Sequence, residues 1–125
     1  MKMIKTESFT NTKNILIAPE NAITLPAIIG GSAGATIKAG TPLFGDLTAR
    51  QTAFVKETTA SSASNANVVL LHDVVLGSGK TEGNGTIIVS GLVDLLKLDT
   101  DVVSMITTEV KKALAGKVEF TKGRK

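Results

Sequence analysis

Two apolar runs, VVLLHDVVL at residues 68–76 and TIIVSGLV at residues 86–93, organise this 125-residue chain. Both runs are rich in Val and Ile, which favour a pleated, buried backbone. The segment between them, GSGKTEGNG, consists of Gly, Ser, Thr, Asn and charged residues, a composition typical of a chain reversal. The pattern predicts a long β-hairpin. Because both runs are nearly continuous in apolar residues, we expect both faces of the hairpin to be buried.

The composition is that of one domain with an aliphatic core. The chain is 42% hydrophobic and 20% charged, and its length is close to the roughly 100–150 residues of a common domain. It has four Phe but no Trp or Tyr, so a binding face built on aromatic anchors is not expected. The absence of Cys excludes disulfides, a thiolate nucleophile and Cys-based zinc sites, and it favours a reducing origin.

The rest of the chain predicts short strands around this hairpin. Residues 21–29 form an apolar stretch that Pro26 is expected to interrupt. GGSAGA at residues 30–35 and the polar residues 59–67 are loops by composition. Short strands are expected at residues 14–17, within 35–47 on either side of a turn at 38–40, at 50–58, and at 117–121.

One helix is predicted in the C-terminal region. Asp99 or Thr100 caps its start, and Gly116 stands where the residue after a helix belongs. Asp94, Asp99 and Asp101 lie around its beginning, as expected for caps and dipole partners. Apolar residues recur at steps of three and four: Val102, Val103, Ile106, Val110, Ala113 and Leu114. The fold class expected from the residues is therefore mainly β with one C-terminal-region α-helix.

The two ends of the chain differ from this domain. Residues 1–14 show no sustained periodicity and predict a flexible N-terminal arm, residues 15–122 a single β-rich domain, and residues 123–125 a disordered basic tail. The net charge of +3 comes from Lys and Arg near the ends, without the aromatic-studded basic stripe of a nucleic-acid binder. No apolar run approaches the roughly 20 residues of a membrane helix, and no secretory signal is recognisable, so we expect a soluble protein made in the cytoplasm.

Two segments resemble nucleotide-binding motifs without meeting their requirements. GSGKT at residues 77–81 contains the GKT of a P-loop, but the Gly required five residues before Gly79 is Val74, and no helix is expected to follow. The Gly-rich segment 30–35 lacks the following helix and acidic residue of a dinucleotide fingerprint. We interpret residues 77–85, including Asn84-Gly85, as the hairpin turn.

His72 is the single histidine, and Asp73 follows it. Neighbours on a strand point to opposite faces, so Asp73 is not expected to orient the imidazole, and a local hydrogen bond of the ring is expected instead. One His without Cys does not predict a metal site. The residues thus predict a non-enzymatic protein without catalytic residues, cofactor, metal or small-molecule substrate.

Three segments resemble head decoration and head fibre proteins of tailed bacteriophages: LLHDV at residues 70–74, VSGLVDLLKL at 89–98 and IKAGTPL at 37–43. The resemblance spans roughly residues 35–122. It implies a compact β-clip-like or small barrel-like domain without enzymatic activity. The chain departs from these relatives at Val75-Leu76, where they often continue with acidic or polar residues, which leaves the partner surface at the hairpin tip open.

The resemblance implies a structural protein of the virion that binds the outer surface of the expanded head. Its partner would be the major capsid protein, and homotrimers at threefold or quasi-threefold positions would reinforce the shell. Because the arm of several such proteins orders only on the capsid, the capsid contacts are expected in the arm, at Met1, Met3, Ile4, Phe9 and Lys13.

Two other functions remain open at this point. One is a trimeric base or adaptor domain of a phage head fibre or tail structure, which has the same fold and a different attachment point. The other, of a different class, is a small nucleotide- or sugar-binding enzyme module that uses the Gly-rich turns. Lys80→Ala separates the second from the binding proteins, since it would abolish ligand binding at a phosphate site.

Overall fold

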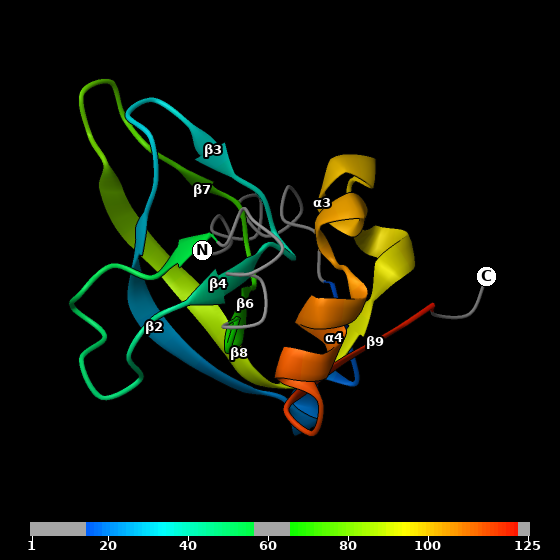
Figure 1. Ribbon diagram of the computed structural model, residues 1–125. Helices are drawn as coiled ribbons and strands as arrows, with labels where there is room; N and C mark the ends of the chain where they lie inside the picture. The colour runs from blue at the N-terminus through cyan, green and yellow to red at the C-terminus, as the bar shows by residue number, and fades with distance from the viewer. Residues whose placement is uncertain (1–14, 57–65, 123–125) are drawn as a thin grey trace, which may run out of the picture.

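The computed structural model describes residues 15–56 and 66–122, and within them it is mainly β (Figure 1). Two short helices lie in the C-terminal region, so the predicted fold class is confirmed. The strands are β1 Leu16–Ile17, β2 Ile23–Gly30, β3 Thr36–Ile37, β4 Pro42–Phe44, β5 Val55–Lys56, β6 Val68–Leu70, β7 Val74–Val75, β8 Glu82–Asp94 and β9 Val118–Thr121. The helices are α3 Thr100–Met105 and α4 Thr108–Leu114, with 3-10 turns η1 Pro19–Asn21 and η2 Leu95–Lys97.

Strand β8 is the strand to which most of the sheet is joined. It pairs antiparallel with β1, β2 and β6 and parallel with β9, while β6 continues to β4 and β4 to β5. An isolated bridge joins Ile29 of β2 to Phe54, which directly precedes β5. The bridge therefore brings β2 close to β5, the last strand of the sheet order. This contact is a single bridge and not a strand ladder, so the small barrel-like arrangement stays open.

The predicted hairpin is confirmed only for the half farther from the turn. Val69 and Leu70 of β6 lie opposite Ile88 and Ile87 of β8, as the two apolar runs predicted. The first run then breaks, and β7 pairs with β3 instead of β8. The Asp73 carboxylate accepts a hydrogen bond of 2.7 Å from the Ala39 amide, which ties the break to the neighbouring turn.

Asn84 and Gly85 lie inside β8, so their assignment to the turn was wrong. The reversal occurs earlier, where the Lys80 amide donates to the Gly77 carbonyl and Gly79 has a φ of 77°. Glycine is required within β8 for packing, because a Cβ on Gly85 would lie 2.6 Å from Ile29 Cγ1 and 2.9 Å from Val74 Cγ2.

Pro26 does not interrupt its strand, contrary to expectation, since β2 runs unbroken from Ile23 to Gly30. The amides of Ile28 and Gly30 point away from β8 and donate to Arg50 and Phe54 carbonyls. The backbone N–H direction alternates along a strand, so the nitrogen of Pro26 points the same way as those of Ile28 and Gly30. Its missing N–H therefore removes no hydrogen bond to β8.

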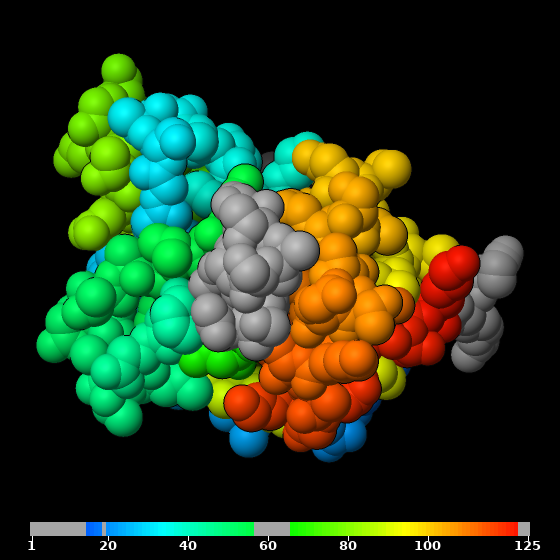
Figure 2. Space-filling model, viewed as in Figure 1, coloured from blue at the N-terminus to red at the C-terminus, as the bar shows by residue number. Residues whose placement is uncertain are grey.

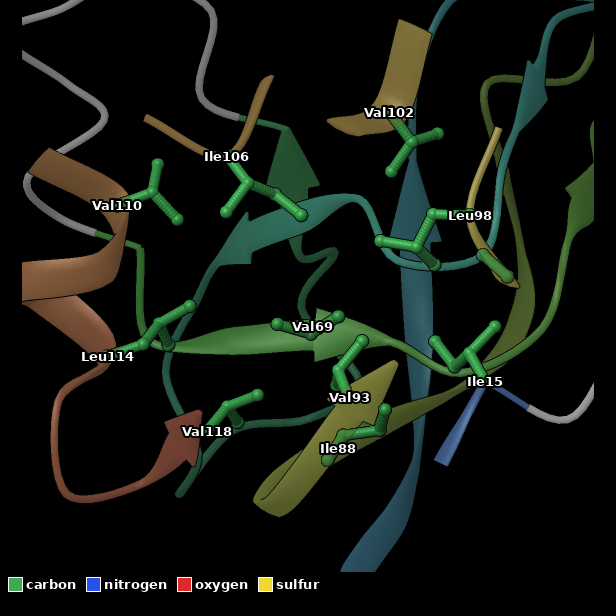
Figure 3. Packing of buried hydrophobic residues seen from close by; sticks show 11 residues of the cluster. Ile15, Val69, Ile88, Val93, Leu98, Val102, Ile106, Val110, Leu114 and Val118 are labelled. Carbon is green, nitrogen blue, oxygen red and sulfur yellow. The ribbon is translucent and has the colours of Figure 1, made fainter. Parts of the chain in front are cut away.

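Two clusters of buried side chains lie on opposite faces of β6 and β8, which confirms burial on both faces. One cluster joins Val69, Ile88 and Val93 to the helices, and Figure 3 shows these strand side chains facing Ile106 and Leu114. The other contains Val68, Leu70 and Ile87 together with Ile29, Leu43 and Phe54.

The predicted single helix is two helices that share one apolar face. Ile106 leaves the helical conformation (φ −90°, ψ 82°), and the Thr107 hydroxyl then caps α4 by accepting from the Val110 amide at 3.3 Å. Val102, Val110 and Leu114 of the two helices and Ile106 between them are buried as expected, whereas Val103 is 36% exposed, contrary to the prediction, and Ala113 is only half-buried. Gly116 follows α4 with a φ of 82°, as predicted for the residue after a helix.

Candidate interaction surfaces

The capsid-contact residues predicted from sequence lie outside the described residues. They are Met1, Met3, Ile4, Phe9 and Lys13, and the whole arm 1–14 and tail 123–125 share this position. Within residues 15–56 and 66–122, no helix has the length and apolar character needed to cross a membrane.

The two Gly-rich segments hydrogen-bond to each other. The Gly31 amide donates to the Thr81 carbonyl at 2.9 Å, and the Gly34 amide donates to the Gly77 carbonyl at 3.1 Å. Strand β8 follows directly where a P-loop would have a helix. These two amides serve the strand connections, which agrees with the interpretation of both segments as loops.

The His72 imidazole and the Asp73 carboxylate do not hydrogen-bond to each other in the described chain. Asp73 Oδ1 accepts from the Ala39 amide. The buried Nδ1 atom of His72 has no hydrogen-bond partner within the described chain, so the expected local hydrogen bond is missing at this atom. The described residues contain no group of three or more His, Cys, Asp or Glu side chains placed to hold a metal ion.

The acidic residues around α3 have structural partners. Asp94 is buried, and its Oδ1 accepts from the Leu96 amide at 2.9 Å, so it caps η2 and not the predicted α-helix. Asp99 is the N-cap of α3 by position but makes no side-chain cap hydrogen bond. Its Oδ2 lies 3.3 Å from Lys38 Nζ, and Asp101 Oδ2 lies 3.1 Å from the same atom. Hydrogen bonding to Asp101, and next to Asp99, raises the pKa of the Lys38 amine above 10.5.

An apolar patch lies on the outer surface of β4 and β5. Phe44 and Val55 are direct cross-strand partners, and each is 43% exposed. Ala53 stands two residues before Val55, and a Cβ on Gly30 would lie 3.0 Å from Ala53 Cβ and 3.4 Å from Val55 Cγ1. We call Phe44, Ala53 and Val55 the β4–β5 patch. Strand alternation was the available sequence signal, because Leu43 is buried and its neighbour Phe44 must then face outward.

A shallow open depression of about 370 Å³ lies over β2 and β8. The Arg50 guanidinium lies at its wall and donates from Nη1 to the Pro26 carbonyl at 2.8 Å. The Pro26 carbonyl is therefore already hydrogen-bonded, and Pro26 has no amide proton to donate. This position on the edge of β2 thus cannot readily pair with another strand. The lining residues are Pro26, Ala27, Ile28, Arg50, Gln51, Asn84 and Gly85.

Neither the protein-family models nor the curated proteins include a match to this chain. Among the exposed large apolar side chains of the described residues, Phe44 and Val55 are the pair that lie opposite each other on neighbouring strands, so the β4–β5 patch is the candidate interaction surface.

Proposed function

We propose that this protein is a non-enzymatic structural protein of a tailed-bacteriophage head that binds the outer surface of the expanded capsid and stabilises the shell. The observation that carries the proposal is the β4–β5 patch. An aromatic and a β-branched side chain stand side by side on two short strands, each 43% exposed, in a chain with only four Phe. The resemblance of residues 35–122 to head decoration proteins supports the same function.

A small patch suits a partner that offers many copies of one site. The two exposed side chains bury far less area than a stable isolated complex requires. A capsid presents the same site many times, and contacts between neighbouring copies add to each attachment, so modest contacts per copy suffice. Trimers at threefold or quasi-threefold positions, which the resemblance to decoration proteins implies, would supply such neighbours.

Co-sedimentation with shells of the major capsid protein from the same genome tests the proposal. We expect saturable binding to expanded shells and none to unexpanded shells. Phe44→Ser is expected to weaken binding about tenfold, because the aromatic contact is lost. Ile23→Ser is the control, since Ile23 is 56% exposed but lies on β2, outside the patch. Equal circular dichroism spectra would establish that both variants are folded.

The arm provides a second and separate test. Deleting residues 1–13 is expected to leave the fold intact and to weaken binding, because the arm is predicted to contact the capsid. Failure of the full-length protein to bind either shell would refute the proposed function and favour the fibre-base or tail adaptor. Saturable binding of a nucleotide or sugar, lost in Lys80→Ala, would instead favour the enzyme module.

A further inference from the structure

Positive charge gathers at the C-terminal end of the described chain. Residues 106–122 carry two Glu and four exposed Lys, whereas residues 94–101 carry three Asp and one Lys. The helical side of the molecule therefore has an acidic beginning at α3 and a basic end at α4 and β9. We call the four lysines of this basic end the lysine face: Lys111, Lys112, Lys117 and Lys122.

Lys111 and Lys112 of the lysine face lie on α4, whereas Lys117 lies in the connection to β9 and Lys122 directly follows β9. Helix α4 contacts β9, and the connection between them is short, with the Lys117 amide donating to the Leu114 carbonyl at 2.9 Å. Val110 and Leu114 turn one side of α4 into the core, so Lys111 and Lys112 stand on its exposed side. Figure 2 shows α4 in orange and β9 in red on the surface, across from the green segment that contains β4 and β5.

The charges of these lysines are not neutralised within the described chain. None of the four forms an ion pair there, in contrast to Lys38, which has two carboxylate partners. Glu119, the acidic residue of β9, accepts a hydrogen bond of 2.8 Å from the Gly116 amide and is not bonded to a lysine. Four unpaired ammonium groups on adjoining elements make an electrostatic docking face for an anionic partner.

We propose that the lysine face docks on a carboxylate-rich protein surface. Glu109 and Glu119 stand among the lysines and would repel a continuous phosphate backbone, whereas a protein surface can place its carboxylates between them. The aromatic residue of β9, Phe120, packs against the core and offers no free ring for base stacking. The inference rests on the proposed function only for the identity of that surface, which would be the outer face of the major capsid protein.

A pair of charge-matched variants tests the inference with poly-L-glutamate as the probe. Lys111→Gln/Lys112→Gln removes two charges from the lysine face, and Lys56→Gln/Lys80→Gln removes two exposed charges elsewhere. At low ionic strength we expect the first variant to bind labelled poly-L-glutamate about fivefold more weakly than the unmodified protein, and the second to bind within about 1.5-fold. Equal losses in both variants would overturn the inference, because net charge alone would then determine binding.

Two further binding experiments distinguish the other possible partners of the lysine face. Tighter binding of double-stranded DNA than of poly-L-glutamate, lost in Lys111→Gln/Lys112→Gln, would assign the face to nucleic acid and refute the inference. With expanded shells, we expect binding of this variant to fall less steeply with added salt than binding of the unmodified protein. If shells bind with an unchanged salt dependence, the inference fails and the proposed function stands. If poly-L-glutamate discriminates the variants but shells do not bind, the proposed function fails and the docking face stands.

Discussion

Replacing Gly45 with Ala tests the packing of β4 against Phe54. A Cβ at residue 45 would lie 2.4 Å from Cδ2, 2.5 Å from Cγ and 2.7 Å from Cε2 of the Phe54 ring. Carbon atoms in contact normally lie about 3.5–4.0 Å apart, so three ring carbons would be overlapped by roughly 1 Å. The substitution therefore inserts a methyl group where no space exists.

Neither partner can move away easily. Phe54 is fully buried, and its amide donates to the Ile28 carbonyl at 2.8 Å while its carbonyl accepts from Gly30 at 2.9 Å. Gly45 is held by the Asn67 side chain, whose Oδ1 accepts from its amide and whose Nδ2 donates to its carbonyl. We expect a loss of about 3 kcal/mol in the free energy of unfolding, at the upper end of the cost of overpacking a core. That loss corresponds to a Tm lower by about 10 °C for a domain of this size.

Chemical denaturation followed by circular dichroism measures this loss, since the chain has no Trp. Gly77→Ala is the matched control, because its Cβ would meet only Lys80 Cγ at 3.4 Å, and a change within about 0.5 kcal/mol is expected. The double variant Gly45→Ala/Phe54→Leu should lose less than the sum of its single variants, because the smaller side chain relieves the overlap. A Gly45→Ala protein as stable as Gly77→Ala, or strict additivity in the double variant, would refute the reasoning.

Three further substitutions address other parts of the fold. Gly85→Ala is expected to cost about 2 kcal/mol by overpacking β8 against aliphatic side chains of β2 and β7, and a thermal melt shifted by less than about 2 °C would contradict that packing. Asn67→Ala removes both hydrogen bonds to Gly45 and should cost roughly 1–3 kcal/mol in urea denaturation; an unchanged midpoint would show that water replaces the amide. The raised pKa of Lys38 predicts a stabilisation that is fully present below pH 10.5 and is lost as the pH rises through its folded value. The difference in Tm between the unmodified protein and Lys38→Met should therefore be smaller above pH 10.5 than below it, and a constant difference would show that the pairing with Asp101 contributes nothing.

Local chemistry made much of the fold predictable. The β-branched runs at 68–70 and 86–88 are buried on both faces because apolar residues without alternation have no solvent-facing side. Gly116 ends the helical segment because its φ of 82° disfavours residues with a Cβ. The interpretation of GSGKT as a turn was likewise correct, since neighbouring residues determine whether a helix can follow.

Long-range contacts decided the features that the sequence did not reveal. Pro26 is accepted within β2 because the register turns its nitrogen away from β8, and Asn84-Gly85 is strand because Ile29 and Val74 need the space of a missing Cβ. The single apolar periodicity predicted one helix, but the chain forms two, with Thr107 capping the second, and Val103 of the predicted face is exposed.

The sequence by itself determined the mainly β composition of the fold, the helical C-terminal region and its buried face, because propensity, periodicity and capping act between residues close in the chain. Only the tertiary structure decided that Phe44 and Val55 meet on the surface and that β7 pairs with β3 instead of β8. Strand register and helix packing bring together residues that are distant in sequence, and local patterns do not encode which pairs will meet.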